Sequence, residues 1–465
     1  MDKKYQTIIG MEVHVELKTA SKMFCGCKND PFHAEKPNIY TCPVCLGMPG
    51  ALPVANKKAI EWTIKLGLAL GCKINLISKF DRKHYFYPDL PKGYQISQYD
   101  LPFCYGGKVE TSFGPVGITR VHLEEDTGKL IHQQVNGQDV SLIDFNRSSV
   151  PLVEIVTEPE IYSSAQAKEY AKKLRQIVRY LDISDCDMEK GGMRLEANIS
   201  LAKVSLRAEA KQSQGDRHVA TAPRDDILPK YKVELKNINS FRYLEKGIEY
   251  EIARQAKILD ENNLPDQETR GYNAEKNITY VQRSKENAAD YRYFPDPDLP
   301  PIKFDELWLN EIKSTVPETL DEVFTRWEKD YKVNRKLTEL LFETAEEAEK
   351  IDKLFKVLLK EKLSVEKFVN VIINKKISIR LSEKELIKLA KDLLQPKETD
   401  VARLDSLINQ LIKENPKVVE DYKKGKVNSI MFLVGQVMRE MKGQADANIV
   451  ISKLKAQMSN LHVKS

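Results

Sequence analysis

A proline-rich segment divides the chain into two parts with different sequence patterns. Residues 294–301 read Phe-Pro-Asp-Pro-Asp-Leu-Pro-Pro, and no helix runs through them because proline lacks the backbone N–H and restricts the residue before it. Short alternating stretches and all seven cysteines precede the segment, and Lys/Glu-rich stretches with helical spacing follow it. A chain of 465 residues is long enough for two or three domains. We expect a strand-containing domain over 1–294, a helical domain over 295–402 and a small helical tail over 403–465.

Alternating side chains in the first part predict a sheet. Residues 10–17 alternate apolar and polar side chains, which is typical of a strand with one buried face. Further strands are expected over residues 118–124, 193–200 and 232–236. Helical spacing occurs over residues 58–70 and after Ser163, which forms a capping box with Gln166. Helices segregated from a mixed, mostly antiparallel sheet define the α+β class.

Composition sets limits on location and partners. The net charge of +5 is compatible with an RNA partner, although many other enzymes share it. The N-terminus has no apolar signal core, and no run of about 18 apolar residues predicts a membrane span. An odd number of cysteines without an export signal favours metal binding or free thiols over disulfides. We expect a cytoplasmic protein.

Two close cysteine pairs indicate a zinc site. Cys25 and Cys27 form one pair, Cys42 and Cys45 form the other, and residues 28–41 separate them. Four thiolates complete a tetrahedron around Zn²⁺, and such a closed site is structural because it leaves no position for a substrate. Four ordinary buried cysteines are the alternative interpretation. The isolated cysteines, expected to be small buried apolar residues, are Cys72, Cys104 and Cys186.

Polar strand faces suggest a metal and phosphate site. Glu12 and His14 are two residues apart, so both side chains leave the same face of one strand. Other polar strand residues are Arg194, Glu196, Asn198, Ser200, Glu234, Lys236 and the acidic strand end at 122–126. Several carboxylates with one imidazole suit a hard cation such as Mg²⁺, and the interspersed cations suit phosphate oxygens. Each face taken alone is more often simply solvated, and no P-loop motif is present.

A segment rich in aromatic and basic residues lies at 79–100. Its cations are suited to phosphate and its tyrosines to stacking, a combination that binds unpaired RNA ends. The cations are Arg82, Lys83 and Lys92, and the tyrosines are Tyr85, Tyr87, Tyr94 and Tyr99. Prolines and glycine make the segment a structured loop rather than a helix. A surface loop anchored by tyrosines is the equally weighted alternative.

Long motifs along the whole chain resemble one family, the B subunits of the glutamyl/aspartyl-tRNA amidotransferases. The matching stretches are residues 9–17, 42–50, 81–98, 122–126, 143–156, 234–240, 290–295, 415–422 and 432–436. The run at 143–156, Ile-Asp-Phe-Asn-Arg-Ser-Ser-Val-Pro-Leu-Val-Glu-Ile-Val, is the family's most distinctive one. The resemblance implies a cradle-shaped catalytic domain, a helical domain and a tail that grips tRNA.

The resemblance also implies an activity, cofactors and partners. The enzyme would be a ligase that forms a C–N bond with glutamine as the amide donor. The B subunit would use ATP and Mg²⁺ to phosphorylate the side-chain carboxylate of Glu-tRNA(Gln) or Asp-tRNA(Asn). Ammonia made from glutamine by an A subunit would then displace phosphate, and a small C subunit would bind both in a heterotrimer.

Carried onto this chain, the resemblance implies a set of site residues. The positions at the metal–phosphate site are Glu12, His14, Glu125, Glu196 and Glu234. The Mg²⁺ ligands among them are His14 and Glu125, with Glu124 and Glu125 left open because neighbours on a strand face opposite sides. Contacts to ATP are expected from Arg194, Lys236, Arg82, Lys83 and Tyr85. This chain has Glu196 where the family usually has Asp, and residues 212–230 resemble an insertion.

The sequence leaves two other functions open. The chain could be a non-catalytic tRNA-binding subunit of the same complex, with the ATP site on a partner. It could also be a free-standing zinc hydrolase, although a closed four-cysteine site argues against that. A tRNA-binding role for the tail is expected through Lys423, Lys424, Lys426 and Arg439, with a solvated helix face as the alternative.

Overall fold

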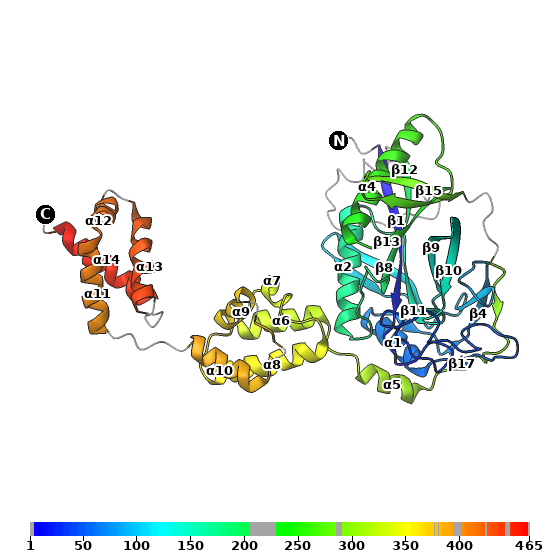
Figure 1. The fold of residues 1–465 in the computed structure, drawn as a ribbon, viewed down its shortest axis with the longest axis horizontal. Helices are drawn as coiled ribbons and strands as arrows, with labels where there is room; N and C mark the ends of the chain where they lie inside the picture. Colours follow the sequence, from blue (N-terminus) through cyan, green and yellow to red (C-terminus); the bar gives the residue numbers. More distant parts are fainter. Residues whose placement is uncertain are drawn as a thin grey trace, which may run out of the picture. The chain divides into compact units, whose positions relative to one another are not determined.

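The computed structural model describes residues 4–203, 229–284, 291–375, 377–379, 381–394, 401–423, 426–441 and 447–463. Most of the expected insertion and Lys424 lie outside these residues, as do Pro396, which predicts a helix break, and Gly425 and Gly443, which predict helix stops. The chain forms two compact units, of which the first is Met1–Arg326 with Phe342–Ala348. The second unit is Trp327–Leu341 with Glu349–Ser465. Figure 1 shows the helices and strands of each unit.

A ten-stranded sheet organises the first unit, in the order β15-β14-β13-β12-β1-β11-β8-β6-β2 with β7 paired to β8. Every strand pair in it is antiparallel except β13 with β14, so the α+β prediction is confirmed. The sheet strands are β1 (Tyr5–Glu16), β2 (Lys73–Ile74), β6 (Cys104–Tyr105), β7 (Lys108–Thr111), β8 (Gly114–Glu125), β11 (Pro151–Thr157), β12 (Met193–Lys203), β13 (Val233–Ile238), β14 (Glu268–Asn273) and β15 (Ile278–Ser284). The smaller sheets contain β3 (Ile77–Ser78), β4 (Asp81–His84), β5 (Tyr94–Ser97), β9 (Lys129–Val135), β10 (Gln138–Asp144), β16 (Phe294–Pro295) and β17 (Ile302–Lys303).

Strand β1 lies in the middle of the sheet, between β11 and β12. Its apolar residues Met11, Val13 and Val15 are fully buried in the main core, as the alternation predicted. Burying three aliphatic side chains contributes several kcal/mol, roughly 1.5–3 kcal/mol each. The same alternation turns the polar residues of β1 to the other face.

Helices cover the apolar face of this sheet. The helices of the first unit up to residue 314 are α1 (Lys57–Ala69), α2 (Ser164–Tyr180), α4 (Phe241–Asp260) and α5 (Glu306–Ser314). Helices α2 and α4 lie against each other on the same side of the sheet (Figure 1). The predicted capping box opens α2: the Ser163 hydroxyl accepts from the Gln166 N–H at 3.1 Å. The Gln166 side chain reaches one residue further back, to the N–H of Tyr162 at 2.9 Å.

The proline-rich segment is part of the first unit. Strand β16 pairs with β4, and β17 pairs with β3. Leu299, Phe304 and Ile312 join the main core. Residues 79–100, expected as a structured loop, contain the antiparallel pair β4–β5. The aromatic and basic segment is therefore held between the sheet and the chain that follows residue 290.

The second unit is helical. Its helices are α7 (Arg335–Thr338), α9 (Val365–Asn374), α10 (Glu383–Leu394), α11 (Val401–Glu414), α12 (Pro416–Lys423), η2 (Val427–Ser429), α13 (Ile430–Glu440) and α14 (Ala447–Val463). The residues of α6 (Leu320–Tyr331) and α8 (Ala345–Lys360) are divided between the two units. Helices α11 to α14 share a separate core that includes Leu404, Leu433 and Leu454. No helix among the described residues is long and apolar enough to cross a membrane.

Candidate metal and phosphate site

One face of the sheet carries polar side chains across four neighbouring strands. Glu12 and His14 of β1 leave the face opposite the core, because alternate residues share a face. The register places His14 opposite Arg194 on β12 and opposite Glu154 on β11. Glu154 in turn lies opposite His122 on β8. The polar faces expected from separate strands therefore form one continuous row.

His14 lies between two carboxylates in this row. Its Nε2 atom is 3.6 Å from Glu124 Oε1 and 3.5 Å from Glu154 Oε2. The donor atoms of these three residues all lie within 4.8 Å of one another. Burial alone would lower the pKa of His14, but the Glu154 and Glu124 carboxylates help raise that pKa to about 9. One imidazole and two carboxylates suit a divalent cation.

Glu125 has different partners. Its carboxylate accepts from the Lys92 ammonium at 2.6 Å and from the Ile96 N–H at 3.0 Å. Glu124 accepts instead from the Ser97 hydroxyl at 3.1 Å. The structure thus brings Glu124, and not the expected Glu125, to His14. Adjacent strand residues face opposite sides, and contacts from β5 fix which of the two faces the imidazole.

A second group of carboxylates lies beside the first. Oxygens of Glu12, Glu196 and Glu234 all lie within 4.8 Å of one another. The Lys236 ammonium is 3.1 Å from Glu196 Oε2 and 3.3 Å from Glu234 Oε1. Burial alone would lower the pKa of Lys236, but the Glu196 and Glu234 carboxylates raise it above its ordinary value. An all-oxygen group of this kind fits Mg²⁺, which prefers carboxylate ligands.

Neutral side chains orient two of these carboxylates. Asn198 donates to Glu12 Oε1 at 2.7 Å, and the Thr269 hydroxyl donates to Glu234 Oε2 at 2.8 Å. Asn198 Oδ1 and His14 Nδ1 are buried and have no hydrogen-bond partner within the described part of the chain. Buried polar atoms are normally paired, so each of these two atoms has a hydrogen-bonding position open to a group bound on this face.

Arg194 is anchored at the end of the row. Its guanidinium lies 3.0 Å from Asp126 Oδ2, and Arg147 reaches the same oxygen at 3.6 Å. Burial would raise the pKa of Asp126, but the two guanidinium groups outweigh it and hold that pKa below its ordinary value. Arg194 therefore presents a fixed positive charge beside His14.

Lys83 and Tyr85 lie next to the first group. The Lys83 ammonium lies 5.8 Å from the ring centre of Tyr85 and 5.0 Å from that of Tyr291. Burial opposes its charge, but the carboxylates of Glu124 and Glu154 raise the pKa of Lys83. These residues give the site a cation with aromatic walls, as expected for phosphate beside a stacked base.

Arg82 is committed elsewhere. Its guanidinium donates to Asp296 and to Asp298, each at 2.8 Å, and stacks 4.3 Å from the ring centre of Tyr94. Asp296 is buried and belongs to the proline-rich segment. The structure thus uses Arg82 to hold that segment against β4 and does not bring it to the carboxylate groups.

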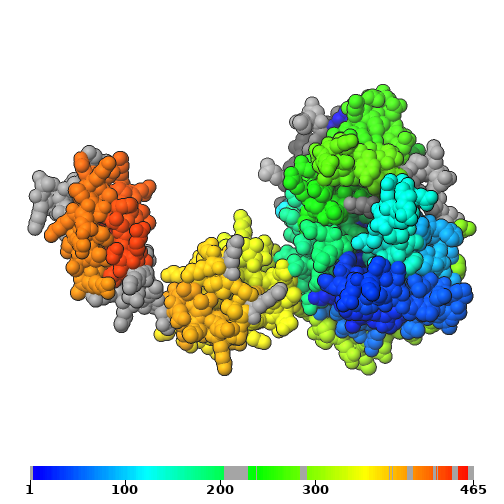
Figure 2. Space-filling model, viewed as in Figure 1, coloured from blue at the N-terminus to red at the C-terminus, as the bar shows by residue number. Residues whose placement is uncertain are grey.

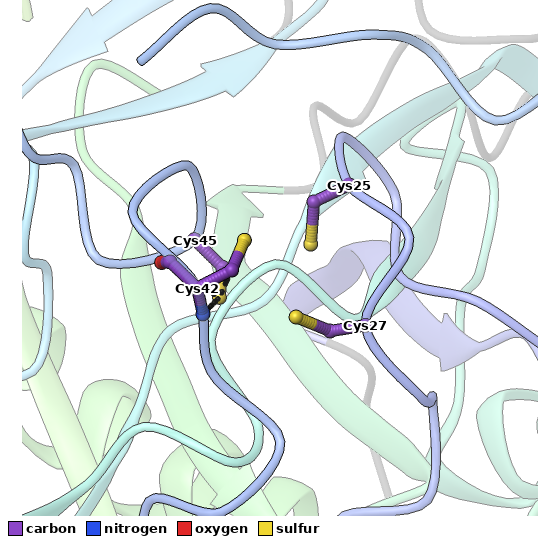
Figure 3. Close-up of side chains that lie close together, drawn as sticks. All are labelled: Cys25, Cys27, Cys42 and Cys45. Carbon is purple, nitrogen blue, oxygen red and sulfur yellow. Dashed lines mark hydrogen bonds between the residues drawn. The ribbon is translucent and has the colours of Figure 1, made fainter. Parts of the chain in front are cut away.

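The four predicted zinc ligands lie together. The sulfurs of Cys25, Cys27, Cys42 and Cys45 all lie within 4.8 Å of one another, and Figure 3 shows two loops turning them toward a common centre. A zinc tetrahedron with bonds of about 2.3 Å separates its sulfurs by about 3.8 Å, and Cys42 and Cys45 are 3.9 Å apart. The Cys25 thiol lowers the pKa of Cys45 to about 5 against the effect of burial. The donor set fits zinc.

The cysteine loops also brace the start of β11. Cys45 O accepts from the Ser148 hydroxyl at 2.8 Å, and the buried Lys22 ammonium donates to Phe145 O at 3.2 Å. The cysteine-bearing N-terminal residues, dark blue in Figure 2, lie at the surface of the first unit. Cys72, Cys104 and Cys186 are buried apart from this group, as predicted.

The protein combines an α+β unit, one sheet face of which carries carboxylates and imidazoles, with a helical unit that follows it in the chain. Residues 7–310 match the family described as "GatB/GatE catalytic domain", and residues 324–458 match "GatB domain". The chain belongs to this family.

Curated relatives agree over the whole length. A protein of Caldanaerobacter subterraneus, named as the B subunit of aspartyl/glutamyl-tRNA(Asn/Gln) amidotransferase, is 41% identical over 98% of this chain and 100% of its own. Proteins of the same name from Carboxydothermus hydrogenoformans and Dehalococcoides mccartyi are each 40% identical, over 99% and 97% of this chain and 100% and 98% of their own.

The structure places three further residues at the site, of which His122 alone lies in a stretch that the sequence had indicated for it, the strand end at 122–126. The sequence did contain a signal for Glu154, because it is the one charged residue in the otherwise largely apolar sequence of β11. His122 lies 3.2 Å from Glu154 and fixes its orientation. Thr269 carried no signal, because only the pairing of β13 with β14 places it opposite Glu234.

Proposed function

We propose that this chain is the subunit of a tRNA-dependent amidotransferase that activates the amino acid on tRNA. It uses ATP to phosphorylate the side-chain carboxylate of Glu-tRNA(Gln), Asp-tRNA(Asn) or both. The relatives' name, the B subunit of an amidotransferase, implies a glutamine-dependent ligase complex. A glutaminase A subunit and a small C subunit complete the proposed heterotrimer, and a cytoplasmic location stays a prediction.

The convergence of two carboxylate groups and three cations on one sheet face carries the proposal. His14, Glu124 and Glu154 would hold one Mg²⁺, and the group of Glu12 would hold a second. Mg²⁺ neutralises phosphate oxygens and orients the γ-phosphate when it is bound.

The chain's own cations complete the neutralisation. Arg194 and Lys83 flank the first group, and Lys236 lies at the second. Phosphoryl transfer requires positioning and charge neutralisation more than covalent chemistry, which is what these groups supply. The substrate carboxylate attacks the γ-phosphorus, ADP leaves, and ammonia then displaces phosphate from the acyl phosphate. The sulfur site is closed, so its zinc takes no part in these steps.

Transfer of labelled phosphate tests the proposal. The chain is co-expressed with its A and C partners, glutamine is withheld, and transfer from γ-labelled ATP to Glu-tRNA(Gln) is measured. His14→Ala and Glu124→Gln should each reduce transfer by at least about 100-fold, because each removes a ligand of the proposed cation. tRNA binding should remain, and the exposed-site variant Glu110→Gln should transfer normally. Unchanged transfer in both site variants would leave a non-catalytic tRNA-binding subunit as the function.

A further inference from the structure

The carboxylate group of Glu12, Glu196 and Glu234 already contains a cation. The Lys236 ammonium lies between the two latter residues, at 3.1 and 3.3 Å from their oxygens. Three carboxylates this close repel one another, and burial with the Glu154 and Glu196 charges raises the pKa of Glu12. One ammonium offsets a single negative charge, whereas a divalent cation offsets two.

Two of the three carboxylates are held by neutral hydrogen-bond donors, whereas the ammonium is carried by a more exposed side chain. Glu12 is held by Asn198 and Glu234 by Thr269, through hydrogen bonds of 2.7 and 2.8 Å. The Lys236 side chain is 36% exposed, against 14% for Glu196 and 11% for Glu234. A lysine ammonium lies on a flexible four-carbon stem, so it can leave while Glu12 and Glu234 stay in place.

The local backbone places Lys236 in this position. The ladder between β12 and β13 shifts register between Leu195 and Ala197, so Glu196 lies at the irregularity. Such irregularities re-aim side chains and are enriched beside active sites. The strand thus presents Glu234 and Lys236 together against Glu196.

We propose that Lys236 is the resident counter-cation of this carboxylate group and exchanges with the divalent cation that enters with the nucleotide. Its ammonium leaves the carboxylates when the cation binds and moves onto the phosphate oxygens. The exchange makes the cation compete with Lys236 in the free protein and cooperate with it once nucleotide is present. This inference rests on the proposed function and adds an order of events to it.

Binding of Mn²⁺, used as the probe, tests the exchange in the full-length chain without tRNA. Lys236→Met keeps the stem and removes the charge. It should bind Mn²⁺ about tenfold more tightly than the unmodified chain when nucleotide is absent, because the competing charge is gone. The same variant should bind Mn²⁺-ATP about tenfold more weakly, because a phosphate contact is lost. Lys236→Arg keeps the charge and should preserve the order of both affinities.

Lysine labelling in the unmodified chain gives a second readout that needs no variant. Acetylation of Lys236, followed by mass spectrometry, should increase when Mn²⁺ is added and fall again when ATP is added. Labelling of the exposed Lys57 should not change in either step. If Lys236→Met and the unmodified chain bind Mn²⁺ with equal affinity, or if labelling of Lys236 does not change when Mn²⁺ is added, the exchange is overturned. Neither result would contradict the proposed metal site. Absence of any Mn²⁺ binding overturns the proposed metal site, and the exchange with it.

Discussion

Glu124 and Glu125 are neighbours in the chain but have separate environments. Glu124 faces His14 at 3.6 Å, whereas Glu125 is held by Lys92 and the Ile96 N–H. Both side chains are buried, and removing a carboxylate from water costs free energy unless the carboxylate has hydrogen-bond or charged partners. The two residues obtain these partners from different groups. At the scale of single residues, the site depends on which oxygen points at the imidazole.

Cation affinity should separate these two residues. Glu124→Gln removes a charged donor from the group of His14 and should weaken Mn²⁺ binding at least about tenfold. Glu125→Gln leaves that group complete and should change the affinity less than about threefold, because Glu125 contacts Lys92 instead. Calorimetric titration of the full chain measures both. Equal weakening in the two variants would contradict the assignment of Glu124.

The raised pKa of His14 predicts a pH-dependent stability of the metal-free chain. Its pKa is about 9 when folded, against about 6.5 in an unfolded chain. The stabilisation is complete below pH 6.5 and is lost as pH rises through 9, since the folded state then no longer binds the extra proton. The loss should be of order 3 kcal/mol, measured by urea unfolding in a chelator at pH 6 and pH 9.5. A His14→Asn chain should lack this component, and an unchanged pH dependence in it would rule out His14 as the source.

At the scale of elements, local signals predicted the strands and long-range pairing did not follow from them. Alternation of apolar and polar residues predicted the two faces of β1, and the capping box of Ser163 and Gln166 predicted the start of α2. The partners of His14, Glu154 and Arg194, are set by the register of β1 against β11 and β12, which alternation does not contain. The pair β4–β5 was not predicted, because Pro88 and Pro91 between its two strands are typical of a loop.

The cysteine loops should behave as a removable structural element. The chain should bind one zinc ion, and Cys27→Ser should lose it, because a serine oxygen is a poor substitute for a thiolate. The midpoint of thermal unfolding should fall by roughly 5 °C or more, since metal binding contributes to folding.

A matched cysteine variant controls for substitution itself. Cys72→Ser should retain zinc, because Cys72 lies outside the four-cysteine cluster and its thiol donates a hydrogen bond to Gly106 O at 2.8 Å. Zinc content is measured by atomic absorption and unfolding by calorimetry. Full zinc content in Cys27→Ser would contradict the four-sulfur site. Mn²⁺ binding to the sheet face should persist in the unmodified chain and in both cysteine variants, because none of its proposed ligands is a cysteine.

At the scale of the whole molecule, separate cores permit separate functions. The main core uses residues between Ile9 and Ile312, and helices α11 to α14 bury their own apolar side chains. Lys426 pairs with Asp421 at 3.0 Å, and Arg439 lies near the end of α13, while the Lys423 side chain lies outside the described part. Removing the last four helices therefore leaves the site's supporting core intact.

Truncation after Leu394 should separate tRNA binding from nucleotide binding. The shortened chain should bind tRNA at least about tenfold more weakly, because phosphate contacts supply much of the affinity for a nucleic acid. Mn²⁺-ATP binding should stay within about twofold, since its ligands come from β1, β8, β11, β12 and β13. In the full-length chain, Lys426→Glu with Arg439→Glu should reproduce part of the loss and reduce its salt dependence. Parallel loss of tRNA and nucleotide binding on truncation would mean that the tail supports the fold of the site and does not act as a separate RNA grip.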